Sequence, residues 1–321
     1  MATSTLSLTL DDIRAAHARI RGHIGRTPVM TSETLDRSFN ASLFFKCENF
    51  QKTGAFKARG ATNAIFTLSG AELLRGVATH SSGNHAAAVA RAAQLRGAKA
   101  HIVMPRNSPQ AKLDNVRRYG GLVTLCEPTL ASREGTLAEI MAKTGAILIH
   151  PYNDLRVAAG QGTACLELME EVPDLDLVLC PVSGGGLLSG TAVAAKGLSS
   201  TVRVIGAEPL GADDASRGFR AGKIIPMLDP HTIADGLRSS VGTLTFPLIQ
   251  ALVDDIVTVS EPGIVAAMKS LWEILKIVVE PSGAVSFGIV NEGNVPVTGL
   301  RVGIILTGGN LDLGSLPWTK A

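Results

Sequence analysis

Short apolar runs alternate with longer amphipathic stretches along most of this chain. The runs are rich in Val, Leu and Ile, and they fall at residues 42–47, 77–80, 101–104, 122–126, 147–149, 177–182, 202–207 and 302–306. The stretches between them repeat their apolar residues with the period of a helix, and include residues 11–24, 86–95, 131–143, 161–171, 187–195 and 262–277. This alternation predicts βαβ units and an α/β fold built on an open, mostly parallel sheet.

The chain is long enough for two lobes. Its 321 residues exceed what a single small core needs, because domains usually have about 100–200 residues. Residues 77–149 contain several of the alternations, enough for a compact unit of their own. We therefore predict a large domain from residues 1–76 and 150–321, and a small mobile domain from residues 77–149. In such sheets ligands bind beyond the carboxyl ends of the strands, so we expect the functional residues in the loops after the strands.

Composition limits the kinds of partner. Hydrophobic residues are 45% of the chain and aromatic residues 4%, so the core depends on Ala, Val, Leu and Ile, as in parallel sheets that helices cover on both faces. The net charge of +2 comes from mixed charges without a run of Lys or Arg, which argues against nucleic acid as a partner. No apolar stretch reaches the roughly 18 residues of a membrane span, and the first residues lack signal-peptide features. We expect a cytoplasmic protein that binds a small molecule and no membrane.

The cysteines indicate neither a metal site nor a disulfide framework. Their spacing matches no metal-binding pattern, and three of the four lie in or beside apolar runs. We expect all of them, Cys47, Cys126, Cys165 and Cys180, to be reduced and buried.

Two loops carry side chains suited to an amine and a carboxylate. Lys57 lies between Gly54 and Gly60 in a weakly polar segment, where partial burial would lower the pKa of its amine; a solvated helix lysine is the alternative. Residues 79–85 follow a predicted strand and precede an Ala-rich helix, so their hydroxyls, amide and helix amide groups would bind a carboxylate. An ordinary polar helix cap is the alternative there.

A third loop is rich in glycine. Ser183 and Gly184 to Gly186 follow an apolar run and precede a helix, which suits an anion such as phosphate. A dinucleotide-binding fold is the competing interpretation, because Glu208 closes the next strand where an acid would bind a ribose. That fingerprint fails at its third position, where Ser189 stands in place of Gly or Ala.

Two further loops complete the set. Residues 208–214 carry carboxylates and free carbonyls that would bind a hard cation, and a solvated acidic turn is the alternative. Thr307 ends the last apolar run beside two glycines, where its hydroxyl could make one hydrogen bond to a ligand.

In this order and spacing, the five loops resemble the fold-type II pyridoxal-phosphate enzymes of the serine racemase, serine/threonine dehydratase and 3-hydroxyaspartate dehydratase group. The resemblance extends from about Ile24 to Trp318. It implies the two-lobed, open parallel-sheet fold of the tryptophan synthase β-subunit type, a homodimer, and Lys57 as the lysine that holds pyridoxal 5'-phosphate as a Schiff base. The other cofactor-binding residues that it implies are Phe56, Asn84, Ser183, Gly184, Gly185, Gly186, Leu187, Gly236, Glu280 and Thr307.

The resemblance also implies residues for the substrate and for a metal. Ser82 is expected on the face opposite Lys57 as a second catalytic residue. The substrate-binding residues would be Ser81, Ser82, Asn84, His85 and Arg133. The metal ligands would be Glu208, the carbonyl of Ala212 and Asp214, around Mg2+, Mn2+ or Ca2+.

The implied activity is removal of water from a β-hydroxy amino acid, 3-hydroxyaspartate, serine or threonine, to give a keto acid and ammonia. Racemases commonly have serine at the position of Ala55, and in this respect the chain resembles the hydroxyaspartate dehydratases instead. Ala87 stands where nucleotide-activated animal racemases have Gln. Serine racemase with side dehydratase activity is the alternative within the family, with Ser82 returning a proton to Cα. A non-catalytic small-molecule sensor is an alternative of another class, which the joint presence of Lys57, Ser82 and Thr307 disfavours.

Overall fold

A computed structural model describes residues 7–81, 83–108 and 110–318 and contains two sheets. The larger sheet has the order β1 (Val29–Met30), β2 (Ser42–Cys47), β10 (Arg301–Leu306), β7 (Leu177–Pro181), β8 (Arg203–Pro209) and β9 (Asp255–Val259). Only β1 pairs antiparallel with its neighbour; the other pairs are parallel. The predicted α/β fold with a mostly parallel sheet is confirmed.

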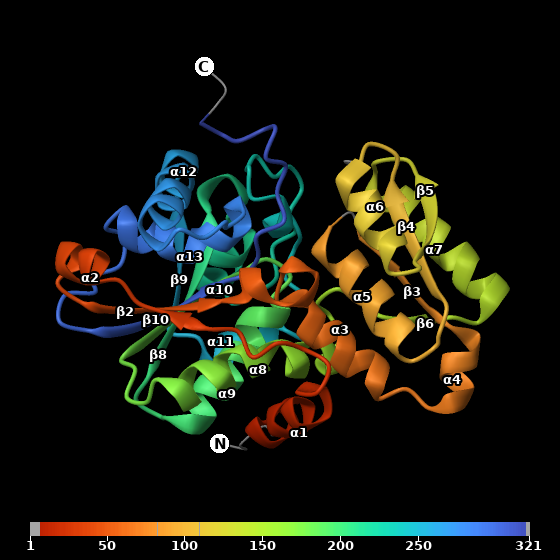
Figure 1. Cartoon of the computed structure of the whole chain (residues 1–321), viewed down its shortest axis with the longest axis horizontal. Helices are drawn as coiled ribbons and strands as arrows, with labels where there is room; N and C mark the ends of the chain where they lie inside the picture. Colours follow the sequence, from red (N-terminus) through yellow and green to blue (C-terminus); the bar gives the residue numbers. More distant parts are fainter. Residues whose placement is uncertain (1–6, 82, 109, 319–321) are drawn as a thin grey trace.

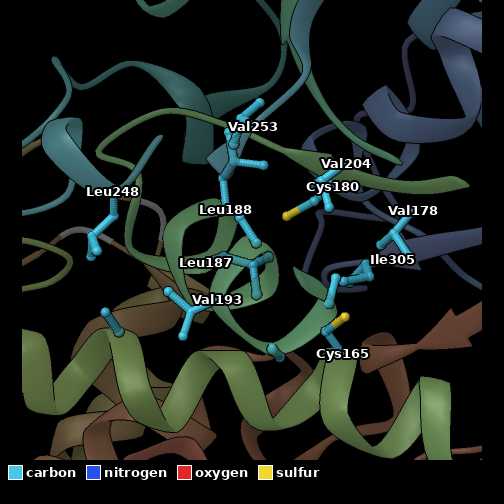
Figure 2. Packing of buried hydrophobic residues seen from close by; sticks show 14 of the residues in the cluster. Cys165, Val178, Cys180, Leu187, Leu188, Val193, Val204, Leu248, Val253 and Ile305 are labelled. Atoms are coloured by element: carbon cyan, nitrogen blue, oxygen red, sulfur yellow. The ribbon is translucent and has the colours of Figure 1, made fainter. Parts of the chain in front are cut away.

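Helices cover both faces of the large sheet, which explains why its central strands are almost wholly apolar (Figure 1). On one face lie α1 (Leu10–Ile20), α8 (Leu155–Glu171), α9 (Gly186–Leu198) and α11 (Phe246–Leu252). On the other lie α12 (Glu261–Ser270) and α13 (Pro281–Asn291), and α2 (Glu33–Phe39) packs beside β2. Cys165 of α8, Cys180 of β7 and Leu188 of α9 meet in the first of these cores (Figure 2).

The smaller sheet has the order β5 (Leu122–Cys126), β4 (Ala100–Pro105), β3 (Val77–His80) and β6 (Ile147–Leu148), and all its pairs are parallel. On one face α5 (Asn84–Leu95) and α6 (Gln110–Arg118) pack against it, and on the other α7 (Leu130–Thr144). The short helix α4 (Gly70–Arg75) precedes β3. All four strands lie within residues 77–149; that this segment moves as a small domain stays a prediction.

Several boundaries differ from those expected. The structure adds β1, which has only two residues, and β9, an edge strand in which only Ile256 and Val259 are buried, so neither forms a long apolar run. Helix α1 ends at Ile20, and α8 begins at Leu155 because Asp154 caps it by accepting a hydrogen bond from the Arg156 amide. Helix α12 stops at Ser270 and passes into a π-helical turn, Leu271–Leu275. The four cysteines are free and buried, as expected.

Candidate active site

Lys57 is the first residue of helix α3 (Lys57–Phe66), which follows two short 3-10 turns, Glu48–Phe50 and Lys52–Gly54. The amide of Phe56 donates a hydrogen bond to the Thr307 carbonyl at 3.0 Å, which ties the helix start to the carboxyl end of β10. The amine Nζ lies 5.0 Å from the centre of the Phe56 ring and donates to the Pro151 carbonyl at 2.9 Å. Burial lowers the pKa of Lys57 to about 8, so a good part of the amine is neutral near physiological pH.

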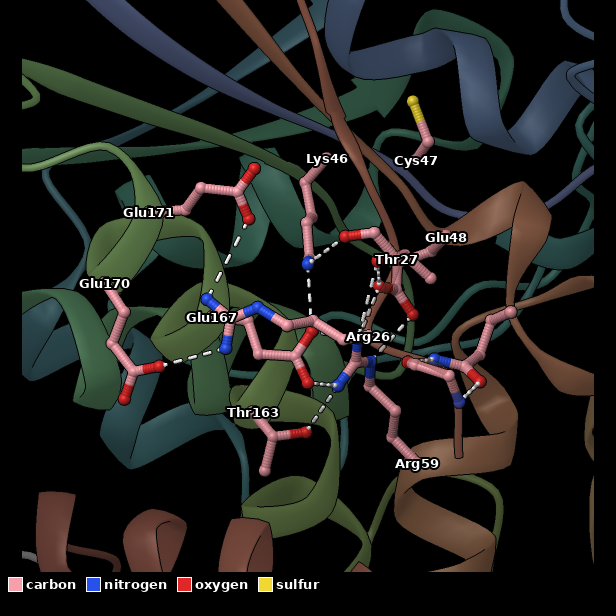
Figure 3. A network of polar contacts seen from close by, with 12 residues as sticks. Arg26, Thr27, Lys46, Cys47, Glu48, Arg59, Thr163, Glu167, Glu170 and Glu171 are labelled. Atoms are coloured by element: carbon pink, nitrogen blue, oxygen red, sulfur yellow. Dashed lines mark hydrogen bonds and ion pairs between the residues drawn. The ribbon is translucent and has the colours of Figure 1, made fainter. Parts of the chain in front are cut away.

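A buried network of charges around Arg59 fixes helix α3 (Figure 3). Arg59 makes two hydrogen bonds with each of two carboxylates, Glu48 and Glu167, at 2.7–2.8 Å. Lys46 donates to Glu167 at 2.8 Å and to the Thr27 carbonyl at 2.7 Å. These contacts fix α3 on its core side. They thereby also fix the position of Lys57, which lies two residues before Arg59 on the side of the helix that faces the loops.

The loop after β3 leads directly into α5. The Ser81 hydroxyl accepts a hydrogen bond from the Gly83 amide at 3.3 Å, and no side chain caps the first turn of α5. His85 is buried and its Nε2 contacts the Ile149 carbonyl at 3.0 Å, which requires a proton on Nε2. Burial, with a contribution from Lys57, lowers the pKa of His85 to about 3, so the ring is neutral. Ser82 lies outside the described residues.

Asn84 is clamped between two distant segments. Its Nδ2 donates to Glu280 Oε1 at 2.8 Å, and its Oδ1 accepts from Asn310 Nδ2 at 2.9 Å. The backbone amide of Asn310 also donates a hydrogen bond to Glu280 Oε2 at 3.1 Å. Burial raises the pKa of Glu280 to about 8, although the hydrogen bonds from Asn84 and Asn310 and the charge of Lys112 act in the opposite direction. Sequence reasoning assigned no role to Asn310, since nothing in the chain signals a contact with Asn84.

The glycine loop meets Tyr152. A Cβ atom at Gly184 would lie 2.1 Å from the Tyr152 ring, so only glycine fits there, and Gly185 has a φ of +86°. Ser183 Oγ donates to the Ser239 carbonyl at 2.9 Å and accepts from its amide at 3.0 Å. Helix α9 begins at Gly186 without a side-chain cap, so the amides of its first turn are available to a phosphate. Tyr152 was not singled out from the sequence.

Three more residues that were predicted to bind the cofactor are Gly236, Thr307 and Leu187. Gly236 belongs to the 3-10 turn Asp235–Leu237, and its amide donates to Ser282 Oγ at 3.0 Å. Thr307 is buried at the end of β10. Leu187, the second residue of α9, is buried among the large core.

The acidic loop after β8 brings Glu208 and Asp214 into one buried turn. Glu208 accepts from the amides of Ala215 at 3.0 Å and Ser216 at 2.8 Å, at the start of α10 (Asp214–Ala221). Asp214 Oδ2 is buried and has no hydrogen-bond partner among the described residues. The 3-10 turn Leu210–Ala212 places buried Ala212 between the two carboxyl groups along the chain. Three or more His, Cys, Asp or Glu side chains do not cluster for a metal anywhere in the described ranges.

Arg133 lies on α7, in the lobe that carries β3. Its Nε donates to the Thr129 carbonyl at 3.4 Å, and no described carboxylate pairs with it. Burial lowers the pKa of His80, the last residue of β3, and the positive charge of Arg133 lowers it further. The guanidinium is therefore close to the loop predicted to bind the substrate.

Known proteins resemble this chain over nearly its whole length. The family described as pyridoxal-phosphate dependent enzyme matches residues 20–308. The beta-hydroxyaspartate dehydratase of Paracoccus denitrificans (strain Pd 1222) is 53% identical over 310 residues, 97% of this chain and 98% of that protein. The serine racemase of Arabidopsis thaliana is 52% identical over 309 residues, 95% of this chain and 93% of that protein. The structure of maize serine racemase matches with a TM-score of 0.95 and 49% identity, over 98% of this chain and 96% of that one. The expected resemblance is confirmed, and the chain belongs to the family of pyridoxal-phosphate dependent enzymes.

Proposed function

We propose that the protein removes water from a β-hydroxy amino acid, preferably 3-hydroxyaspartate, to give a keto acid and ammonia. One observation supports this most directly: the Lys57 amine, with its pKa lowered to about 8 by burial, has only the Pro151 carbonyl as a hydrogen-bond partner among the described residues. At this pKa a fraction of the amine is neutral near pH 7, and the neutral amine can act as a general base. The similarity to a dehydratase at 53% identity supports the direction of the reaction.

The residues around Lys57 fit pyridoxal phosphate. The Ser183 to Leu187 loop would take the phosphate, because its three glycines leave the backbone open to close approach and no side chain caps the amides at the start of α9. Asn84, held in one orientation by Glu280 and Asn310, would meet the 3-hydroxyl. The ring would lie near Phe56 and Gly236. When bound, the cofactor supplies a conjugated ring that accepts the electron pair left on the substrate Cα.

Lys57 and Thr307 then have separate tasks. Lys57 Nζ takes the proton from the substrate Cα, and the Pro151 carbonyl orients the amine for this transfer. The Thr307 hydroxyl would meet the pyridine nitrogen. A neutral hydroxyl does not keep a proton on that nitrogen as a carboxylate would, which favours loss of the β-hydroxyl over transamination.

The substrate would be held by its carboxylates. Ser81, Asn84, His85 and the amides at the start of α5, which no side chain caps, would bind the α-carboxylate. Arg133 would pair with the side-chain carboxylate of 3-hydroxyaspartate, because it lies beside the same loop and has no described carboxylate partner.

Serine racemisation is the second candidate, favoured by 52% identity to a plant serine racemase. In this alternative Ser82 returns a proton to Cα from the face opposite Lys57. Both reactions would use the same site and begin with the same proton removal, and they would differ only in the next step.

We further propose a Mg2+, Mn2+ or Ca2+ ion bound by Glu208, the Ala212 carbonyl and Asp214. The buried, unpartnered Asp214 Oδ2 supports it, since a buried carboxylate oxygen needs a proton, a hydrogen bond or a cation. A homodimer and a cytoplasmic location also stay predictions. No helix in the described ranges is both long and apolar enough to span a bilayer.

A panel of β-hydroxy amino acids tests the proposed function. The stereoisomers of 3-hydroxyaspartate, serine and threonine should be assayed in parallel for keto acid and for the inverted enantiomer. Keto acid from 3-hydroxyaspartate as the fastest product supports the proposal. Faster inversion of serine than release of any keto acid would favour the racemase, and no reaction with any substrate would refute both.

A further inference from the structure

One ion pair joins the two lobes across the proposed substrate loop. Lys112 of α6, in the lobe with the small sheet, pairs with Asp235 of the large-sheet lobe, 123 residues further along. In the described ranges no other ion pair connects residues 77–149 with the rest of the chain. The two side chains are 24% and 45% exposed, so solvent reaches the pair and its partners can exchange.

The Lys112 ammonium lies directly over the loop after β3. A Cβ atom built on Gly83 would be 3.8 Å from Lys112 Nζ. The charges of Lys112 and Asp235 also act in opposite directions on Glu280, which accepts the hydrogen bond from Asn84. A cation is thus held next to the residues that we propose for the substrate carboxylates.

Arg133 and Lys112 approach this loop from different helices. Arg133 of α7 is close to His80 at the start of the loop, and Lys112 of α6 is close to Gly83 further along it. Two cations beside one carboxylate-binding loop match a substrate with two carboxylates better than a substrate with one. One of the two cations, Lys112, already forms an ion pair with Asp235.

We propose that Lys112 is a specificity-determining residue that binds, together with Arg133, the side-chain carboxylate of a dicarboxylic amino acid, and that Asp235 is the counter-ion this carboxylate replaces. The inference rests on the proposed function and deepens it. It assigns opposite effects to the two partners: Lys112 attracts the second carboxylate, whereas Asp235 competes with it. An ion pair that served only to join the lobes would give both partners the same effect.

Binding of an unreactive dicarboxylate separates these cases. The Kd of succinate and of propionate should be measured by calorimetry on the cofactor-loaded protein for Lys112→Met, Lys112→Arg and Asp235→Asn. Lys143→Met is the matched control, because Lys143 is an exposed lysine of α7 in the same lobe. We expect Lys112→Met to weaken succinate relative to propionate by about tenfold or more, and Lys112→Arg to stay within about threefold of wild type.

The decisive variant is Asp235→Asn, which should tighten succinate relative to propionate, by about threefold or more. If Asp235→Asn and Lys112→Met both weaken succinate, the pair only joins the lobes and the inference is wrong. It is equally wrong if the wild type does not distinguish succinate from propionate, or if Lys143→Met matches Lys112→Met. Turnover is measured separately: failure to act on any β-hydroxy amino acid refutes the proposed function, while the binding shifts still decide the role of Lys112.

Discussion

Replacing Arg59 by methionine removes the centre of the buried network that anchors helix α3. Arg59 and Glu48 are fully buried, and Glu167 is 1% exposed. The guanidinium makes four hydrogen bonds of 2.7–2.8 Å to the two carboxylates, two to each. Methionine is also long and flexible, so Arg59→Met chiefly removes charge and hydrogen bonds rather than volume.

The structure indicates the size of the loss. Removing one partner of a buried ion pair costs about 3–5 kcal/mol, because the remaining charge stays in a medium of low polarity. Glu167 keeps Lys46 at 2.8 Å, whereas the one partner left to Glu48 among the described residues is the Thr27 hydroxyl at 2.6 Å. We therefore expect Arg59→Met to lower the free energy of unfolding by about 4–5 kcal/mol, the upper part of that range. Adding Glu48→Gln removes the unpaired charge and should restore about 1–3 kcal/mol.

Urea unfolding at neutral pH, followed by far-UV circular dichroism, measures these differences. Arg37→Met is the control, since Arg37 forms an exposed pair with Glu33 at 4.0 Å and should change stability little. A loss below about 1 kcal/mol for Arg59→Met would refute the reasoning, because removing one partner of a buried ion pair should lower the free energy of unfolding by several times that amount. A further loss on adding Glu48→Gln would refute it as well.

Four other predictions concern the site. Lys57→Ala should reduce turnover by about a thousandfold or more and leave the cofactor bound only non-covalently, seen as loss of borohydride-fixed cofactor; ordinary activity would contradict the role of Lys57. Since burial lowers the pKa of Lys57 to about 8 and only the neutral amine attacks an aldehyde, covalent uptake of pyridoxal phosphate by the cofactor-free protein should become faster as pH rises through about 8 and then level; a fall over that range would contradict it. A chelator should lower the melting temperature and the activity together, and Mg2+ or Mn2+ should restore both. The Asp214→Asn variant should not respond to the chelator. If the chelator changes neither quantity and the protein contains no metal, the acidic turn does not bind a cation. Arg133→Ala should lower the preference for 3-hydroxyaspartate over serine, as a ratio of kcat/KM, by about tenfold to a hundredfold; equal loss on both substrates would make Arg133 structural.

Local patterns predicted much of the fold. The strands β2, β3 and β5 begin and end as expected, because each is a short run rich in residues that favour strands, even though β5 is largely exposed. The edge strand β9 did not stand out, because Asp255 and Thr258 interrupt its apolar residues and only two of its five residues are buried. Its pairing with β8 decides its conformation, and that pairing is not visible in its own residues.

The sequence by itself determined which loops carry chemistry. Lys57 between glycines, and Ser183 with three glycines at a helix start, are local features, since a positive φ or a close approach depends on residue type. Only the tertiary structure decided which distant residues act on them. Asn84 meets Glu280, 196 residues away, and Lys112 meets Asp235 across the lobes. Arg59 would be expected in solvent on residue type alone, yet it is fully buried between Glu48 and Glu167. The physical reason is that a charge can be buried only where the fold brings its counter-charges together, and the path of the chain through two sheets sets those positions.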